Sequence, residues 1–224
     1  MKQYVFSFLK GILAGLAIGV GGFLYILMIH FVSGELGKVL GSILFAVGLF
    51  TVCTFSLHLY TGKIGVIYEG KQSKEFYISL PIMLVGNAIG AFGLGYICFF
   101  IFRNTDIFVT ATAAAESRLV FADGMDFVTT MIKSFLCGVC VYLAVKSFTL
   151  NRLRPLGIAL LVFFVFLFVY CGFQHCIANM FYFGFGNHMK PNTLINLLIV
   201  ILCNSIGPLP GVMIFKLIKN KKEK

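Results

Sequence analysis

Two polar side chains stand inside stretches of the sequence that are otherwise apolar. His175 lies in GFQHCIANM, residues 172–180, and Thr61 lies in LHLYTGKIG, residues 57–65. An imidazole donates a hydrogen bond from its ring or, as imidazolium, passes a proton to the anion of a weak acid. The threonine hydroxyl donates and accepts. These residue types indicate a site for a small anion, because an anion that loses its water needs such donors.

The composition of the chain predicts that this site lies in a membrane. Of the 224 residues, 59% are hydrophobic and 12% are charged, and the mean hydropathy is +0.97, values far outside those of soluble domains. A spanning helix needs about 20 apolar residues. Six such runs lie at about 8–32, 39–57, 76–102, 127–148, 157–183 and 193–218. We therefore expect a single all-α transmembrane domain over residues 1–224, and the first run is too long for a cleaved leader.

The positions of Lys and Arg predict the orientation of the chain. On one side fall 13 of the 18 basic residues: Lys2, Lys10, Lys63, Lys71, Lys74, Lys146, Arg152, Arg154, Lys216, Lys219, Lys221, Lys222 and Lys224. Positive residues mark the cytoplasmic side, so both termini are expected there. The net charge of +10 is then explained mostly by the Lys and Arg that orient the chain in the membrane. The basic segment 219–224 is interpreted as a solvated tail, and no nucleic-acid partner is expected.

The two halves of the sequence resemble each other. VGNAIGAFGLGYI in the third run aligns with LCNSIGPLPGVMI in the sixth, which pairs Asn87 with Asn204 at an offset of 117 residues. The same offset pairs His58 with His175. FLKGILAG in the first run aligns with MIKSFLCG in the fourth at an offset of 123 residues. Each half holds three runs, an odd number, so the halves have opposite orientations and form an inverted repeat.

Each half also contains one run that loop-forming residues interrupt. The halves span about 8–102 and 127–218, and the interrupted runs are the second and the fifth. Thr, Gly and Lys follow the second run, and HCIANMFYFGFGN, residues 175–187, carries an Asn and two Gly in the fifth. Irregular backbone at membrane depth is tolerated only where protein buries it or where it lines a cavity. Both interruptions are therefore expected to line a central path.

The motifs at these interruptions resemble those of the formate/nitrite transporter family. HLYTG at 58–62 is similar to the family's Glu-Leu-Phe-Thr-Gly, and FQHCIANMF at 173–181 is similar to its Glu-His-Ser-Ile-Ala-Asn-Met-Phe. Gly-Asn-x-x-Gly at 86–90 and Asn-x-Ile-Gly at 204–207 support the resemblance, which covers nearly all of the chain. It implies an aquaporin-like fold and homopentamers with one anion pore per subunit.

The resemblance also implies roles for single residues. His175 would be the central pore histidine, and Thr61 its hydroxyl partner on a mobile loop. Further candidate pore residues are Asn179, Asn87 and Asn204; candidate constriction residues are Phe45, Leu49, Leu59, Tyr60 and Phe168; candidate loop and gating residues are His58, Gly62 and Lys63. Asn87 and Asn204 are expected to join helices by bonding to broken backbone.

Four positions depart from the family pattern. The acid before the central histidine is Gln174, the acid of the loop motif is His58, Thr-Gly-Asn becomes Thr-Gly-Lys at Lys63, and an expected Asn is Gly138. We expect the His58 imidazole to orient the loop by hydrogen bonding rather than to handle a second proton. These departures leave the scaffold intact and bear on substrate, gating and any pH response.

Two other classes of function fit some of the same residues. A neutral-solute pore of the same architecture predicts a flux that is independent of pH and of membrane potential. An intramembrane metal-dependent enzyme would use His58, His175 and Cys176, yet no carboxylate lies in the six runs to orient an imidazole. The seven cysteines all lie in apolar runs and are interpreted as buried thiols.

The sequence therefore favours a channel over an enzyme. The expected substrates are small monovalent anions of the formate, nitrite or hydrosulfide class, which cross passively or together with a proton. No metal and no cofactor are expected. The expected location is a bacterial inner membrane, and the resemblance carries most of that inference.

Overall fold

All regular elements in the described part of the chain are helices. The computed structural model describes residues 2–119, 126–150 and 155–222. The helices are α1 (Lys2–Phe31), α2 (Gly34–Thr54), α3 (Tyr60–Lys63), α4 (Val66–Glu69), α5 (Lys74–Phe102), α6 (Asp106–Glu116), α7 (Phe127–Leu150), α8 (Pro155–Tyr170), α9 (Cys176–Phe185), α10 (Pro191–Ile206) and α11 (Pro208–Lys222). Arg152, Arg154 and Lys224, part of the basic set above, lie outside the described residues.

Five helices among the described residues are long and apolar enough to cross a membrane. They are α1, α2, α5, α7 and the stretch Pro191–Leu217, which combines α10 with most of α11. Where the sequence predicts a fifth run at 157–183, the structure has two short apolar helices, α8 and α9. Each is shorter than the roughly 20 residues that span the hydrocarbon layer. The protein is therefore an integral membrane protein with a divided fifth run.

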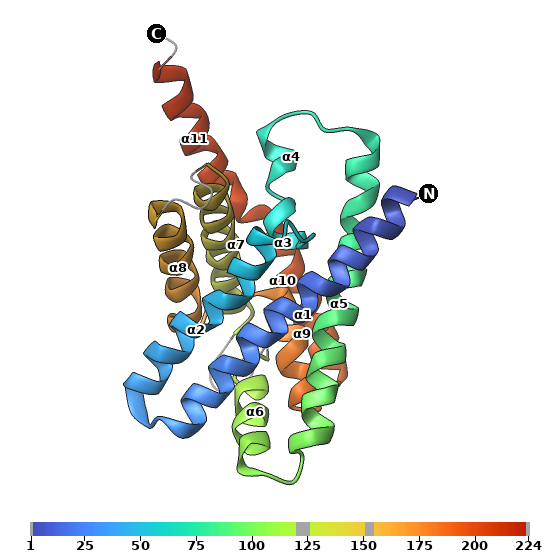
Figure 1. The fold of residues 1–224 in the computed structure, drawn as a ribbon, viewed down its shortest axis with the longest axis vertical. Helices are drawn as coiled ribbons and strands as arrows, with labels where there is room; N and C mark the ends of the chain where they lie inside the picture. Colours follow the sequence, from blue (N-terminus) through green and yellow to red (C-terminus); the bar gives the residue numbers. More distant parts are fainter. Residues whose placement is uncertain (1, 120–125, 151–154, 223–224) are drawn as a thin grey trace.

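Helix α6 is absent from the sequence expectation, which has only a connection between the third and fourth runs. Its eleven residues, DIFVTATAAAE, pack against α9 and α1. In Figure 1, α6 lies at the end of the molecule opposite to both termini. This end is called the outer end below, and the end with the termini is called the inner end.

Small residues let the long helices approach each other closely. Helix α1 packs against α2 and α5, and α7 packs against α8 and α10 (Figure 1). A Cβ atom on Gly90 would lie 2.1 Å from the carbonyl oxygen of Ile12. A Cβ atom on Gly207 would lie 2.4 Å from the carbonyl oxygen of Phe135. Both contacts join a glycine of one helix directly to the backbone of another, the usual role of small residues in membrane proteins.

Replacement of Gly90 by alanine is expected to destabilise the α1–α5 contact. The added methyl group has no flexible neighbour that can yield, and overpacking of this kind costs about 1–3 kcal/mol. The matched control is Gly93→Ala on the same helix, where a Cβ meets no atom within 4 Å. Unfolding in mixed micelles, followed by circular dichroism, should show a lower free energy of unfolding for Gly90→Ala only. Equal stability of the two variants would contradict the close contact.

The ends of α2 and α8 have the same local geometry. After α2, the N–H of Leu57 donates to the carbonyl of Val52 at 2.9 Å; after α8, the N–H of Phe173 donates to the carbonyl of Phe168 at 2.8 Å. The intervening Ser56 has φ 52° and Gly172 has φ 65°. Only a few L residues adopt such left-handed values. The two breaks are therefore equivalent at an offset of 116 residues.

This equivalence corrects the pairing of His58 with His175. The N–H of His58 donates to the carbonyl of Lys10, and the N–H of Gln174 donates to the carbonyl of Lys133, both at 3.4 Å. His58 thus corresponds to Gln174, and His175 corresponds to Leu59. The offset of 117 holds for the third helix of each half, because the segment between the break and that helix is one residue longer in the second half.

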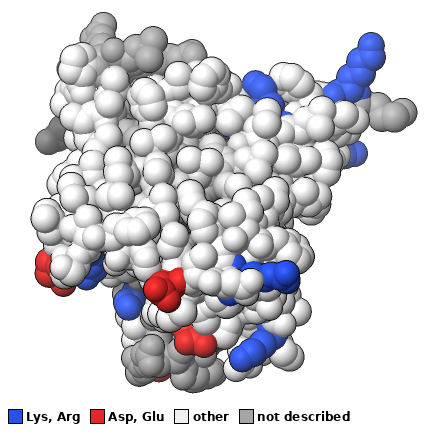
Figure 2. Space-filling view, turned by 60° about the horizontal axis from the view of Figure 1, so that its bottom comes forward, with Lys and Arg blue, Asp and Glu red and all other residues white. Residues whose placement is uncertain are grey.

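Charged side chains gather at the two ends of the molecule. Figure 2 turns the outer end forward and shows Lys, Arg, Asp and Glu mixed there, with a broad band of other residues behind it and further Lys or Arg at the inner end. Among the described residues, the charged side chains at or near the outer connections are Glu35, Lys38, Arg103, Asp106, Glu116, Arg118, Asp126 and Lys190. An uncharged band between two polar ends is the surface that a bilayer requires.

Candidate functional site

Asn87 of α5 fixes the first break. Its amide donates to the carbonyls of Gly11 and His58 at 2.8 and 2.9 Å, and its oxygen accepts from the N–H of Tyr60 at 2.8 Å. The side chain is fully buried. It therefore satisfies the carbonyl of His58 and the N–H of Tyr60, which the end of regular structure would otherwise leave without partners, and ties them to the Gly11 carbonyl inside α1.

Asn204 of α10 makes the same three bonds at the second break. Its amide donates to the carbonyls of Ser134 and Gln174 at 2.6 and 2.8 Å, and its oxygen accepts from the N–H of Cys176 at 2.9 Å. Asn204 is also fully buried. Because both amide hydrogens of Asn87 and of Asn204 are bound to backbone, the two side chains position the breaks and have no donor left for a substrate.

His175 stands at the start of α9, where the second break ends. Its Nδ1 accepts a hydrogen bond from the N–H of Ala178 at 3.1 Å, so the ring caps the helix. Its Nε2 lies 2.8 Å from Oγ1 of Thr61 on α3. Since Nδ1 is an acceptor, the hydrogen of the neutral ring is on Nε2, which donates to Thr61. The structure thus joins one residue of each break in a buried pair.

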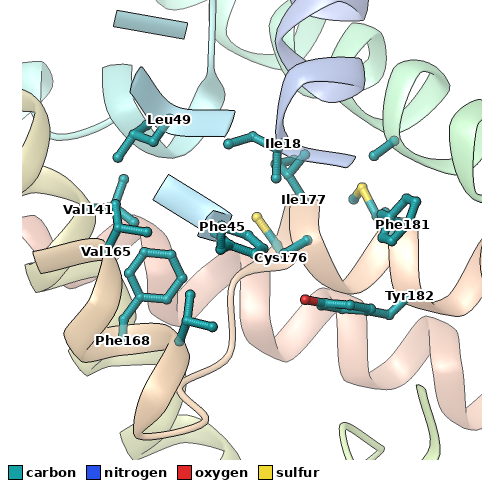
Figure 3. Close-up of a cluster of buried hydrophobic side chains, with 14 of the residues drawn as sticks. Ile18, Phe45, Leu49, Val141, Val165, Phe168, Cys176, Ile177, Phe181 and Tyr182 are labelled. Carbon is teal, nitrogen blue, oxygen red and sulfur yellow. The ribbon is translucent and has the colours of Figure 1, made fainter. Parts of the chain in front are cut away.

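Aromatic rings pack over this pair. The Phe168 ring stacks on the His175 ring with a centroid separation of 5.9 Å and an interplanar angle of 30°. Phe45 meets Phe168 edge to face at 5.8 Å. Figure 3 shows Phe45, Phe168 and Leu49 in one buried cluster with the side chain of Cys176. Three of the predicted constriction residues are therefore grouped next to the histidine.

A cavity lies on the inner side of α3. Its volume is about 180 Å³, and its lining includes Leu59, Gly62, Lys63, Cys53 and Thr149. Leu59 is buried at the start of α3, whereas Lys63 at the end of this helix is only partly buried. Two of the three predicted loop residues, Gly62 and Lys63, thus line this cavity, whereas His58 does not.

Tyr60 and His58 bind partners that the sequence did not indicate. The Tyr60 hydroxyl lies 2.8 Å from Oγ of Ser205, and Ser205 donates to the carbonyl of Ile201 at 2.6 Å. Tyr60 is therefore the donor to Ser205 and ties α3 to α10. Nδ1 of His58 lies 2.9 Å from Oγ of Ser7 on α1. Both bonds hold the segment that carries His58 and Tyr60 in place. Neither serine belongs to a motif that the sequence analysis identified.

A polar chain continues from His175 towards the outer end. Asn179 donates to Oε1 of Gln174 at 2.5 Å, and Nε2 of Gln174 donates to the carbonyl of Arg118 at 3.2 Å. The amide of Asn196 donates to the same carbonyl at 2.6 Å. Sequence reasoning missed Arg118 and Asn196, because the first lies in a connection and the second in an ordinary apolar helix.

The residues named for an intramembrane enzyme do not form a metal centre. No group of three or more His, Cys, Asp or Glu in the described ranges is arranged to hold a metal ion. His175 is bound to Thr61, and His58 is bound to Ser7. The two imidazoles therefore serve different hydrogen bonds, and Cys176 contributes its backbone N–H to Asn204.

Known proteins match the chain over almost its whole length. Residues 2–218 match the model of the formate/nitrite transporter family. The chain is 31% identical to the uncharacterized transporter YrhG of Bacillus subtilis (strain 168) over 187 residues, which are 76% of this chain and 67% of that protein.

Two solved structures share the fold. One is a pentameric formate channel with formate bound, with a TM-score of 0.80 and 24% identity, covering 100% of this chain and 99% of that chain. The other is an ion channel of the FNT family, with a TM-score of 0.76 and 18% identity, covering 96% of this chain and 89% of that chain.

Proposed function

Because the chain belongs to the formate/nitrite transporter family, we propose that it conducts small monovalent anions of weak acids through the site at His175 and Thr61. Formate, nitrite and hydrosulfide are the expected class. The observation that carries the proposal is the buried 2.8 Å hydrogen bond between these two residues, which come from the two backbone breaks. It supplies donors where an anion would otherwise lose its water without compensation.

The direction of the hydrogen bonds gives the two residues separate tasks. His175 donates from Nε2 to Thr61, so the hydrogen of the Thr61 hydroxyl remains for an arriving anion. The anion then accepts from Thr61 and can replace the Thr61 oxygen as acceptor for the His175 N–H. Two neutral donors bind an anion without the full attraction of a buried cation, and this permits release on the other side.

The cap on α9 favours hydrogen-bond donation over proton transfer by His175. The ring can give up a proton only as imidazolium, which carries hydrogens on both nitrogens. A hydrogen on Nδ1 would face the N–H of Ala178, which now donates to this atom at 3.1 Å. Protonation therefore breaks the cap and places a second positive group at a helix N-terminus. We infer that the anion crosses with the ring neutral.

The equivalent breaks support a six-span inverted repeat in the proposed channel. In this arrangement α2 with α3 and α4, and α8 with α9, are the interrupted spans, and α10 with α11 is the sixth. The matched bonds of Asn87 and Asn204 support the assignment. Both termini lie at the inner end, which we place in the cytoplasm of a bacterial cell because most Lys and Arg lie there.

Exposed apolar side chains support a homopentamer in the bilayer. Large apolar residues exposed on α1, α5, α7 and α10 include Val5, Leu9, Leu13, Val85, Ile89, Ile97, Val128, Ile132, Leu194, Leu198 and Leu202. Such surfaces suit either lipid or neighbouring subunits. The similar formate channel is pentameric, and we propose the same assembly for this chain, with one path in each subunit.

The substrate class is tested by flux into liposomes that contain the purified protein. Formate, nitrite, hydrosulfide and chloride are compared at equal concentration and ionic strength with protein-free liposomes. Faster uptake of at least one weak-acid anion than of chloride is expected. Equal uptake of all four, or uptake no faster than in protein-free liposomes, would refute the proposed function.

Thr61→Val is expected to lower the flux of the preferred anion by about tenfold. The substitution keeps the shape and removes one hydroxyl donor, and a hydrogen bond to a charged group contributes about 1.5–3 kcal/mol. Thr61→Ser is the matched control, because it retains the hydroxyl and should keep most of the flux. The initial rate of uptake in liposomes measures the effect. Similar rates for the Val and Ser variants would remove Thr61 from the mechanism.

A further inference from the structure

Arg118, just after α6, is a cation without a carboxylate partner in the described part of the chain. The ion pairs found there join Lys38 to Glu35, Lys146 to Glu69 and His188 to Glu116. The guanidinium of Arg118 instead lies over the ring of Tyr182, 3.8 Å from its centroid, and donates to the carbonyl of Ala114. Neither contact neutralises its charge, and the side chain is only partly exposed.

The backbone of Arg118 is held beside the second break. Its carbonyl accepts from Gln174, the residue before His175, and from Asn196. Gln174 is neutral, and its own oxygen accepts from Asn179. The backbone of Arg118 is therefore held next to the polar chain that leads to His175, and the bonds of this chain given above involve no Asp or Glu of the described residues.

Tyr182 adds a buried hydroxyl beneath this cation. Residues 175, 179 and 182 share one face of a helix, since side chains three and four positions apart are neighbours. Tyr182 is only 2% exposed, and its hydroxyl donates to no acceptor in the described residues. In Figure 3 this hydroxyl points to the side of the cluster where Phe45 and Phe168 lie. A buried donor without an acceptor is costly, so a ligand that accepts from it stabilises the site.

We propose that Arg118 and Tyr182 form a second anion-binding site, which takes a small monovalent oxyanion such as formate about 10 Å further along α9 than His175. The inference rests on the proposed function and deepens it. Arg118 supplies the charge and several N–H groups, and Tyr182 supplies a hydroxyl donor. The aromatic ring keeps the guanidinium partly desolvated, which strengthens its attraction for an anion. Anions from the outer end bind here before they reach the neutral donors at His175.

Thermal stabilisation of the purified protein by sodium formate tests the site directly. Ionic strength is held constant with sodium gluconate, whose anion is too large for the site. For Arg118→Gln, the formate concentration that gives half of the stabilisation should rise about tenfold, as expected for loss of one charge-assisted bond. Arg118→Lys should shift it less, because it retains the charge. Arg103→Gln, at an exposed cation of the same end, should leave it unchanged.

Flux measurements separate this site from the proposed function. In liposomes, Arg118→Gln should raise the half-saturating formate concentration severalfold and leave the maximal rate within about threefold of wild type, because the donors at His175 are intact. Tyr182→Phe, which removes only the hydroxyl, should show a smaller shift of the same kind.

A formate response of Arg118→Gln equal to that of Arg103→Gln, or no response in wild type, overturns the second site whatever the flux. Arg118-dependent stabilisation in a protein without anion flux overturns the proposed function and keeps the site. If Arg118→Gln does not fold, an unchanged response in both Arg118→Lys and Tyr182→Phe overturns the proposal.

Discussion

Replacement of His175 by alanine is expected to reduce formate flux about a hundredfold. The ring supplies a nitrogen donor to the Thr61 hydroxyl, and both side chains are almost fully buried. An anion there cannot recover the lost bond from water, and a bond to a charged group contributes up to about 3 kcal/mol, which corresponds to about two orders of magnitude. Initial uptake rates at equal protein content in the liposomes measure the effect.

A second substitution separates transport from folding in this experiment. His175→Asn keeps an oxygen that can accept from the N–H of Ala178 and an amide N–H that can donate towards Thr61. This variant should be as stable as wild type, while its flux falls about tenfold because the shorter side chain places the donor less well. Wild-type flux in His175→Ala would mean that the buried histidine only caps α9.

Replacement of Asn204 by alanine is expected to cause the largest loss of stability. It removes the partners of the Gln174 carbonyl and the Cys176 N–H, and one hydrogen bond to the carbonyl of Ser134 inside α7. Each of the two buried backbone groups left without a partner costs about 1–3 kcal/mol, so a total loss of about 2–6 kcal/mol is expected. The midpoint of thermal unfolding in detergent should fall accordingly.

Two further variants serve as comparisons for the stability of Asn204→Ala. Asn87→Ala removes the same three bonds at the first break and should destabilise the protein to a similar degree. Asn104→Ala removes an exposed amide and should change the midpoint little. If Asn204→Ala unfolds at the same temperature as Asn104→Ala, then the break is held by other contacts.

The candidate site could be located from the sequence because its residues interrupt apolar runs. His175 and Thr61 each stand in such an interruption, and the structure brings them to 2.8 Å. Repeated motifs likewise predicted that Asn87 and Asn204 occupy matching places. Their three bonds each could not be read from the sequence, because they involve backbone groups of other helices.

The features that the sequence analysis missed or paired wrongly have physical causes. Helix α6 is too short to span a bilayer, so its apolar residues looked like part of a connection. The pairing of His58 with His175 failed by one residue, because one offset was applied across a loop whose length differs between the halves. Arg118 and Ser205 were missed because their roles depend on contacts with residues distant in sequence, Gln174 and Tyr60.

Whether the path carries anions or neutral solutes is tested most directly by comparing formate with urea in the same liposomes. Stopped-flow light scattering gives the rate of solute entry for wild type, for His175→Asn and for protein-free liposomes. Formate should enter wild-type liposomes much faster than protein-free ones and more slowly in His175→Asn, while urea should enter all three at the same rate. Fast urea entry in wild type, with formate no faster than in protein-free liposomes, would contradict an anion channel.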